Sequence, residues 1–270
     1  MSGGRGTSAA RVAVVQLPGV NCEAETARAL ERVGLEAEVF RWMRPVAELS
    51  RYQGYVLPGG FSYQDRVRAG ALAAKDPLIA ELGAAAERGK PILGICNGAQ
   101  VLVESGLVPG GEAVEIGLAR NRMPDRTGYY ARWVHVRVER SRCVFTSTLE
   151  PGTVVPLPVA HGEGRFTARD PERIPALVRA GQTPLRYATV RGAVARDFPA
   201  NPNGSEAAVA AVCNAAGNVL ALMPHPERAQ DAGAVSRSVG GAWGERSQNA
   251  HAAGPGLFLF EALARHILEA

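Results

Sequence analysis

The sequence of 270 residues contains no apolar run near the ~18–20 residues that a membrane-spanning helix needs. Its first residues, 1–10, are rich in Gly and Ser and lack the apolar segment of a secretory signal. We therefore expect a flexible N-terminal tail over 1–10, no membrane partner and a cytoplasmic location. The remaining length, 11–270, is sufficient for a single large domain with a buried core, and length alone also permits two small ones.

Lysine is nearly absent, occurring only at Lys75 and Lys90, so arginine supplies almost all of the positive charge behind the net charge of +4. The arginines are spread along the chain without a run of five basic residues. This distribution is typical of a GC-biased genome and predicts no nucleic-acid partner, although a modest anion-binding face is a second interpretation.

Paired cysteines are absent too. The four cysteines form no C-x-x-C motif, and none lies at zinc-ligand spacing from another Cys or His. Scattered cysteines in a chain of this length predict neither a disulfide framework nor a metal site. Each cysteine must therefore be judged by its own context.

The first half of the chain alternates strand and helix patterns. Strands are predicted at Arg11–Gln16, Glu36–Arg41, Gly54–Leu57 and Pro91–Ile95, and helices at Cys22–Val33, Asp76–Arg88 and Asn97–Ser105. Such repeated β-α units indicate an α/β fold with a mostly parallel sheet and helices on both faces.

The second half reads as mainly antiparallel. Strands are predicted at Arg132–Val138, Val154–Val159, Leu185–Val190, Ala207–Cys213 and Val219–Met223, and a terminal helix at Gly256–Glu269. The alternation in Arg132–Val138 is typical of an antiparallel or edge strand, and Asn214–Asn218 reads as a hairpin turn. The Gly/Ala/Ser-rich segment Gln230–Gly254 is expected to be a loop.

Cys96 is the strongest candidate for chemistry. It lies where a predicted strand enters a predicted helix, with Gly94 and Gly98 on either side as G-x-C-x-G. This is the cysteine counterpart of the nucleophile elbow, in which glycines remove side chains that would clash at the sharp turn. The helix N-terminus also favours a thiolate. Cys22, Cys143 and Cys213 lack this context and are expected to be structural.

A cysteine nucleophile needs a general base, and His225 stands out among the five histidines because it lies in Met-Pro-His-Pro-Glu. A residue before proline is held extended. Since side chains two apart on an extended chain point the same way, Glu227 is expected to reach one imidazole nitrogen and leave the other for Cys96. A proline-rich surface turn is the alternative.

Two N–H donors are needed for the oxyanion formed in acyl transfer. The amide of Asn97, directly after the nucleophile, is one candidate. The glycine-rich loop Leu57–Ser62 follows the third strand and is expected to supply the second from the same edge of the sheet. An ordinary glycine-rich turn is the other interpretation of this loop.

Across nearly its whole length, the chain resembles the class I (triad) glutamine amidotransferases, which have a flavodoxin-like fold. Within them it resembles the glutaminase subunits of phosphoribosylformylglycinamidine synthase. The matching stretches are LPGGFSYQDRVRAG (57–70), GICNGAQVL (94–102), ARNRMPDRTGYYARWVHV (119–136), VAHGEGRF (159–166), PANPNGS (199–205) and MPHPERA (223–229). Two positions depart from the family pattern, Gln64 in place of glycine and Ala99 in place of a frequent second cysteine.

This resemblance implies site residues. Cys96, His225 and Glu227 would form the triad, and Gly60, Phe61 and Asn97 would line the oxyanion hole. Gln100 would contact the glutamine substrate, and the segment containing His161 and Gly162 would lie beside it.

The resemblance also implies partners. Ammonia from glutamine would pass to a synthetase subunit, which with a small third subunit converts formylglycinamide ribonucleotide to the amidine. The sequence has no Walker A loop, so ATP and Mg would be bound by the synthetase subunit and no cofactor by this chain.

Three other interpretations stay open at this point. The elbow also occurs in α/β proteins of the intracellular-protease or deglycase type, although those lack a downstream His-Pro-Glu segment. A non-enzymatic subunit that only binds a partner is the second, and a glutaminase of another pathway is the third.

Overall fold

The computed structural model describes residues 10–111, 113–246 and 249–269, so residues 1–9 of the expected tail lie outside the described residues. A nine-stranded sheet in the order β2-β1-β3-β4-β11-β10-β9-β6-β7 forms its centre. The strands of this sheet are β1 (Arg11–Gln16), β2 (Glu36–Arg41), β3 (Gly54–Leu57), β4 (Ile92–Ile95), β6 (Tyr130–Val138), β7 (Val154–His161), β9 (Leu185–Ala188), β10 (Val209–Cys213) and β11 (Val219–Leu222).

The sheet has a parallel half and an antiparallel half. Strands β2, β1, β3, β4 and β11 run parallel to one another. From β11 onward every pairing is antiparallel, through β10, β9, β6 and β7. The predicted parallel sheet with an antiparallel extension is therefore confirmed, and β3, β4 and β11 are buried along their whole length, as strands covered on both faces must be.

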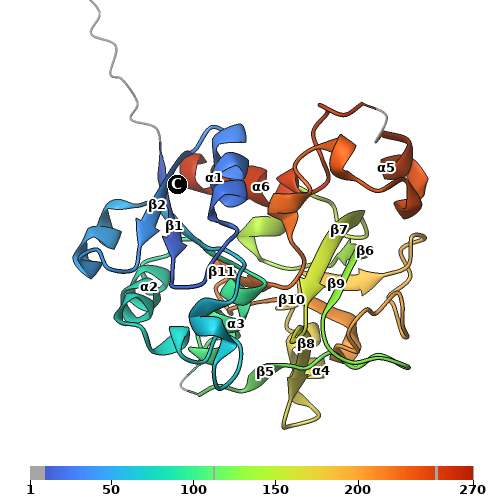
Figure 1. Cartoon of the computed structure of the whole chain (residues 1–270), viewed down its shortest axis with the longest axis horizontal. Coiled ribbons are helices and arrows are strands. Elements are labelled where there is room, and N and C mark those ends of the chain that lie inside the picture. The colour runs from blue at the N-terminus through green and yellow to red at the C-terminus, as the bar shows by residue number, and fades with distance from the viewer. Residues whose placement is uncertain (1–9, 112, 247–248, 270) are drawn as a thin grey trace, which may run out of the picture.

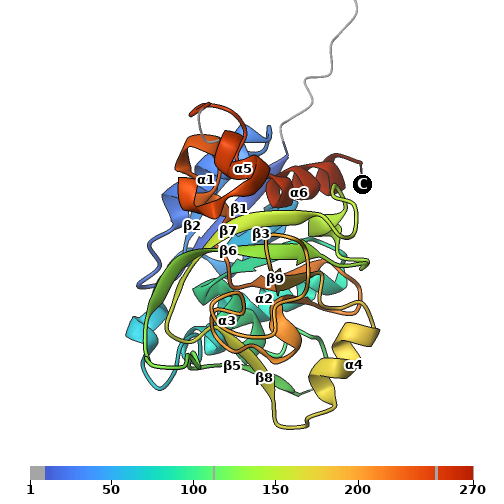
Figure 2. The same ribbon diagram turned by 90° about the vertical axis from the view of Figure 1, so that its right-hand side faces the viewer.

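Helices cover both faces of the parallel half. The helices of the described residues are α1 (Glu23–Arg32), α2 (Pro77–Glu87), α3 (Asn97–Glu104), α4 (Arg173–Arg179), α5 (Gly241–Arg246) and α6 (Leu257–Glu269). Figures 1 and 2 show α1 and α6 on one side of the sheet and α2 and α3 on the other. No helix in the described ranges is long and apolar enough to cross a membrane.

Two strands and two helices of the described residues were not predicted. A small second sheet pairs β5 (Ile116–Ala119) with β8 (Arg165–Ala168), and α4 follows β8. The segment Gln230–Gly254, expected to be a loop, contains the short helix α5. Each of these elements is short, and β5 and β8 pair across a long stretch of chain, so local pattern gives little sign of them.

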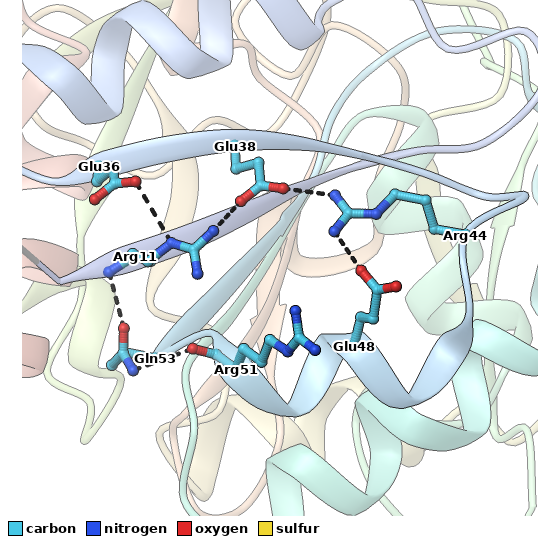
Figure 3. Close-up of polar contacts among 7 residues, drawn as sticks. All are labelled: Arg11, Glu36, Glu38, Arg44, Glu48, Arg51 and Gln53. Carbon is cyan, nitrogen blue, oxygen red and sulfur yellow. Dashed lines mark hydrogen bonds and ion pairs between the residues drawn. The ribbon is translucent and has the colours of Figure 1, made fainter.

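Strand β2 forms one edge of the sheet, and charged side chains line it. Figure 3 shows Arg11 between Glu36 and Glu38, and Arg44 between Glu38 and Glu48. Charges along an edge strand discourage pairing with another chain. These arginines are paired with acids of the same chain, which favours the interpretation of the arginine content as compositional at this face.

Candidate active site

The loops that follow β1, β3, β4 and β11 meet at one edge of the sheet because these strands run parallel. This is the edge at which open α/β sheets place their sites. Cys96 follows β4, the loop Gly59–Ser62 follows β3, and His225 follows β11. The predicted elements are thus brought together by topology alone.

Cys96 occupies a strained backbone conformation between β4 and α3. Its φ and ψ are 50° and −102°, a region that non-glycine residues rarely adopt. A Cβ on Gly98 would lie 2.0 Å from the Leu57 carbonyl oxygen, and one on Gly94 would lie 2.7 Å from the Gly98 oxygen. Both flanking glycines are therefore required sterically, as the nucleophile elbow predicts.

His225 and Glu227 form a buried pair. Nδ1 of His225 lies 2.5 Å from Oε1 of Glu227, and the two residues are 2% and 1% exposed. The predicted contact is present, but the chain is not extended throughout. A 3-10 turn begins at Pro226 and carries Glu227 back under the imidazole.

The pKa of His225 is set by opposing influences. Burial by itself would lower it, but the Glu227 carboxylate and the Cys96 thiol raise it well above its ordinary value. Nε2 of His225 is buried and makes no hydrogen bond to the described residues. The imidazole is thus held by its Nδ1 side, favours the protonated form, and has its other nitrogen free for chemistry near Cys96.

The oxyanion loop and the elbow are tied together. The Ser62 amide donates to Oδ1 of Asn97 at 3.0 Å. The Phe61 amide donates to the Gly19 carbonyl at 2.9 Å, so it is engaged in this conformation. Within the described part of the chain, the amides of Gly60 and Asn97 have no such acceptor. These two amides are therefore the available donors for an oxyanion.

Gln64, which departs from the family pattern, lies just beyond this loop. Tyr63, Gln64 and Asp65 have φ values of 52°, 59° and 52°. A glycine at position 64 would adopt this left-handed conformation without steric cost, and the glutamine adopts it as well. Gln64 is therefore a non-glycine residue in a left-handed backbone conformation. Ala99, the other departure, is fully buried in α3.

The segment after β7 forms one wall of the site. The Cys96 thiol points at the Ala160 carbonyl, 3.7 Å away. Gln100 is only 5% exposed, and its amide donates to the Glu163 carbonyl at 2.7 Å. Gln100 therefore holds the His161–Gly164 segment against the elbow, and both of the weaker predictions, Gln100 and His161–Gly162, lie beside Cys96.

His161 is buried in this wall as a neutral ring. Oδ1 of Asn121 accepts from the Gly164 amide and lies 3.0 Å from Nδ1 of His161, so Nδ1 carries the proton. Burial, with His225 nearby, lowers the pKa of His161 to about 3. Its Nε2 is thus a bare acceptor, buried and without a hydrogen-bond partner among the described residues.

Three further residues at the site were missed by the sequence argument. Tyr129 is 49% exposed, and its ring centroid lies 6.5 Å from that of Phe61. Burial raises the pKa of the Tyr129 hydroxyl, which also interacts electrostatically with Cys96 and His225. Cys22, expected to be structural, lies against the His225–Glu227 pair, and Nη2 of Arg228 donates to its sulfur at 3.0 Å. The sequence did place Cys22 after the first predicted strand, at the edge of the sheet where the site forms, and this position could have identified it as a site residue.

Cys22, His225 and Glu227 are also the kinds of side chain that ligate metals. Their ligating atoms lie within 4.8 Å of one another. However, the Arg228 guanidinium contacts the Cys22 sulfur and lies 3.8 Å from Glu227. A cation placed among these groups would face that positive charge, so the arrangement disfavours a metal ion.

The chain is similar to known glutamine amidotransferases. The family model of the CobB/CobQ-like glutamine amidotransferase domain matches residues 9–267. The PurQ subunit of phosphoribosylformylglycinamidine synthase from Methanothrix thermoacetophila is 44% identical over 266 residues, which are 96% of this chain and 98% of that protein. The PurQ subunit from Thermomicrobium roseum is 47% identical over 232 residues, 86% and 90% of the two chains.

Solved structures extend the comparison. The structure of PurLQS from Thermotoga maritima matches with a TM-score of 0.67 and 36% identity, over 89% of this chain and 96% of that one. A putative GMP synthase subunit from Thermoplasma acidophilum matches with a TM-score of 0.53 at 16% identity, over 97% and 96% of the two chains, and so shares the fold.

Proposed function

Since this chain belongs to the CobB/CobQ-like glutamine amidotransferase family, we propose that it is the glutaminase subunit of phosphoribosylformylglycinamidine synthase. It hydrolyses glutamine to glutamate and ammonia and supplies the ammonia to a synthetase subunit. The observation that supports the chemistry best is the buried 2.5 Å contact between His225 and Glu227 beside the strained Cys96 elbow.

The proposed reaction begins with attack of the Cys96 thiolate on the side-chain amide carbon of glutamine. The amides of Asn97 and Gly60 stabilise the oxyanion. Protonated His225 gives its Nε2 proton to the departing ammonia, which leaves a thioester. His225 then removes a proton from water, the water attacks the thioester, and glutamate leaves as the thiolate reforms.

Glu227 keeps the imidazole oriented and stabilises its protonated form through both half-reactions. The neutral His161 offers an acceptor, Nε2, for an N–H of the substrate or of ammonia. Phe61 and Tyr129 flank the mouth, and we assign Gln100 and Gly162 to shaping the glutamine pocket. We infer these roles from the positions of the residues around Cys96.

The partners follow from the family. The related structure from Thermotoga maritima is a PurLQS assembly, so this subunit works with a synthetase and a small third subunit. We further propose that ATP and Mg bind to the synthetase, that this single domain of 11–270 binds no cofactor, and that the complex works in the cytoplasm. The other-pathway alternative is disfavoured because the two PurQ relatives are 44% and 47% identical over 96% and 86% of this chain.

The test uses the complex assembled from this chain and its two partner subunits. Cys96→Ala should lower the glutamine-dependent rate at least about a thousandfold, because no nucleophile remains. The rate with ammonium salts should stay near that of the wild type, since the synthetase needs only ammonia. Cys143→Ala, in a buried cysteine away from the elbow, is the matched control and should keep both rates. Glutamine use by the Cys96 variant would contradict the proposal.

A further inference from the structure

The loop Leu17–Cys22 joins β1 to α1 and is bound along the oxyanion loop. The amides of Asn21 and Cys22 both donate to the Gly59 carbonyl at 3.2 Å, and the Phe61 amide donates to the Gly19 carbonyl. The two loops are therefore a single backbone unit. Cys22, the last residue before α1, extends from this unit toward the imidazole of His225.

The Cys22 side chain is fully buried and fully partnered. Its thiol donates to Oδ1 of Asn21 at 3.3 Å, and its sulfur accepts from Nη2 of Arg228 at 3.0 Å. The sulfur lies within 4.8 Å of a ring nitrogen of His225 and of a Glu227 oxygen.

Gly59 closes the gap between sulfur and imidazole. A Cβ at this position would lie 2.7 Å from Cε1 of His225 and 3.2 Å from the Cys22 sulfur. Gly59, the imidazole and the sulfur therefore pack without spare room, and any change in the size of residue 22 is felt by the histidine.

We propose that Cys22 is a positioning residue for the glutaminase reaction: its sulfur, held by Arg228, fixes the imidazole of His225 against the oxyanion loop at Gly59. The proposal rests on the proposed function of this site. The general base, His225, and the oxyanion donors lie in loops that follow different strands, and the Cys22 side chain connects these loops. A small misplacement between such groups costs a large part of the rate.

The electrostatic part of this role is open to measurement. The titratable groups that interact with His225 are Glu227, Cys96, Cys22, His161 and Tyr129, and Arg228 lies 3.8 Å from Glu227. Cys22 is among those that raise the pKa of His225. The reaction needs protonated His225 to release ammonia, so activity falls as pH rises through that pKa. Loss of Cys22 should therefore move the alkaline limb to lower pH.

The experiment measures glutaminase kcat and KM across pH in the assembled complex for Cys22→Ala and Cys22→Ser. We expect Cys22→Ala to lower kcat about tenfold to a hundredfold with little change in KM, and to shift the alkaline limb to lower pH. Cys22→Ser keeps an acceptor for Arg228 and should restore part of both effects.

Two controls keep the outcome interpretable. Cys213→Ala also removes a fully buried thiol, and it should leave the pH limbs unchanged. Should Cys22→Ala fail to fold, Cys22→Ser carries the test with a lowered alkaline limb expected, and Arg228→Gln should lower kcat because the Cys22 sulfur loses its partner. Unchanged limbs and a near wild-type kcat in the variants would overturn the positioning role. If Cys96→Ala is inactive while the Cys22 variants behave like the wild type, the positioning role is refuted and the proposed function is still supported.

Discussion

Replacement of His161 by asparagine should make the protein less sensitive to acid. His161 is 3% exposed and its pKa is lowered to about 3, mainly by burial. The asparagine amide can donate to Oδ1 of Asn121 as Nδ1 of the imidazole does, but it does not titrate. His161→Asn thus removes the ionisation while keeping the hydrogen bond.

The size of the effect follows from linkage. An unfolded histidine has a pKa near 6.5, so between that pH and pH 3 the unfolded state binds a proton that the folded state excludes. Folding stability is therefore lost as pH falls through this window. With a native pKa of about 3, the loss is about 2 kcal/mol at pH 5 and about 3 kcal/mol at pH 4.

The assay is urea unfolding of both proteins at pH 7, 5 and 4, followed by circular dichroism. The cavity left by the smaller side chain adds a cost that does not vary with pH, and the carboxylates titrate equally in both proteins. The difference in unfolding free energy between wild type and variant should therefore shrink by the amounts above as pH falls. Parallel pH dependences would show that His161 has the same pKa in the folded and the unfolded protein, and would contradict a lowered pKa in the folded state.

Two further variants test the triad and the elbow. Glu227→Gln should lower glutaminase kcat by about 10²- to 10⁴-fold and move the alkaline limb to lower pH, because the carboxylate that raises the pKa of His225 is gone; an unshifted limb in the pH profile would contradict this. Gly98→Ala should cost about 1–3 kcal/mol in urea unfolding and abolish glutamine use, since its Cβ would meet the Leu57 oxygen at 2.0 Å. Gly117→Ala, with open space around its Cβ, is the matched control, and equal losses in the two alanine variants would refute the steric argument.

The parallel half of the fold was readable from the sequence because β1, β3, β4 and β11 contain short apolar runs and helical patterns alternate with the strands. β1, β2 and β3 have the predicted bounds. The elbow was readable for the same reason, since strand, cysteine and helix are contiguous. The contact between His225 and Glu227 was also local, being set by residues two apart, although the 3-10 turn that makes it was not expected.

Features that depend on distant segments could not be predicted. Cys22 and Arg228 are 206 positions apart, and only the order of strands in the sheet brings them together. The pairing of β5 with β8 and the wall formed by His161 and Asn121 are equally non-local. The engaged amide of Phe61 depends on a loop after another strand. Sequence reasoning therefore proposed Cys96, His225 and Glu227 from local motifs, and it missed contacts such as that between Cys22 and Arg228, which depend on distant segments.

The central claim, that Cys96 is the nucleophile, is tested most directly by covalent labelling of the assembled complex. An electrophilic chloroketone analogue of glutamine should inactivate glutamine-dependent synthesis, and glutamine should protect against it. Mass spectrometry of the digested subunit should then find the adduct on the peptide that contains Cys96, with ammonium-dependent synthesis intact. An adduct on Cys22, Cys143 or Cys213 that accounts for the inactivation would contradict the assignment.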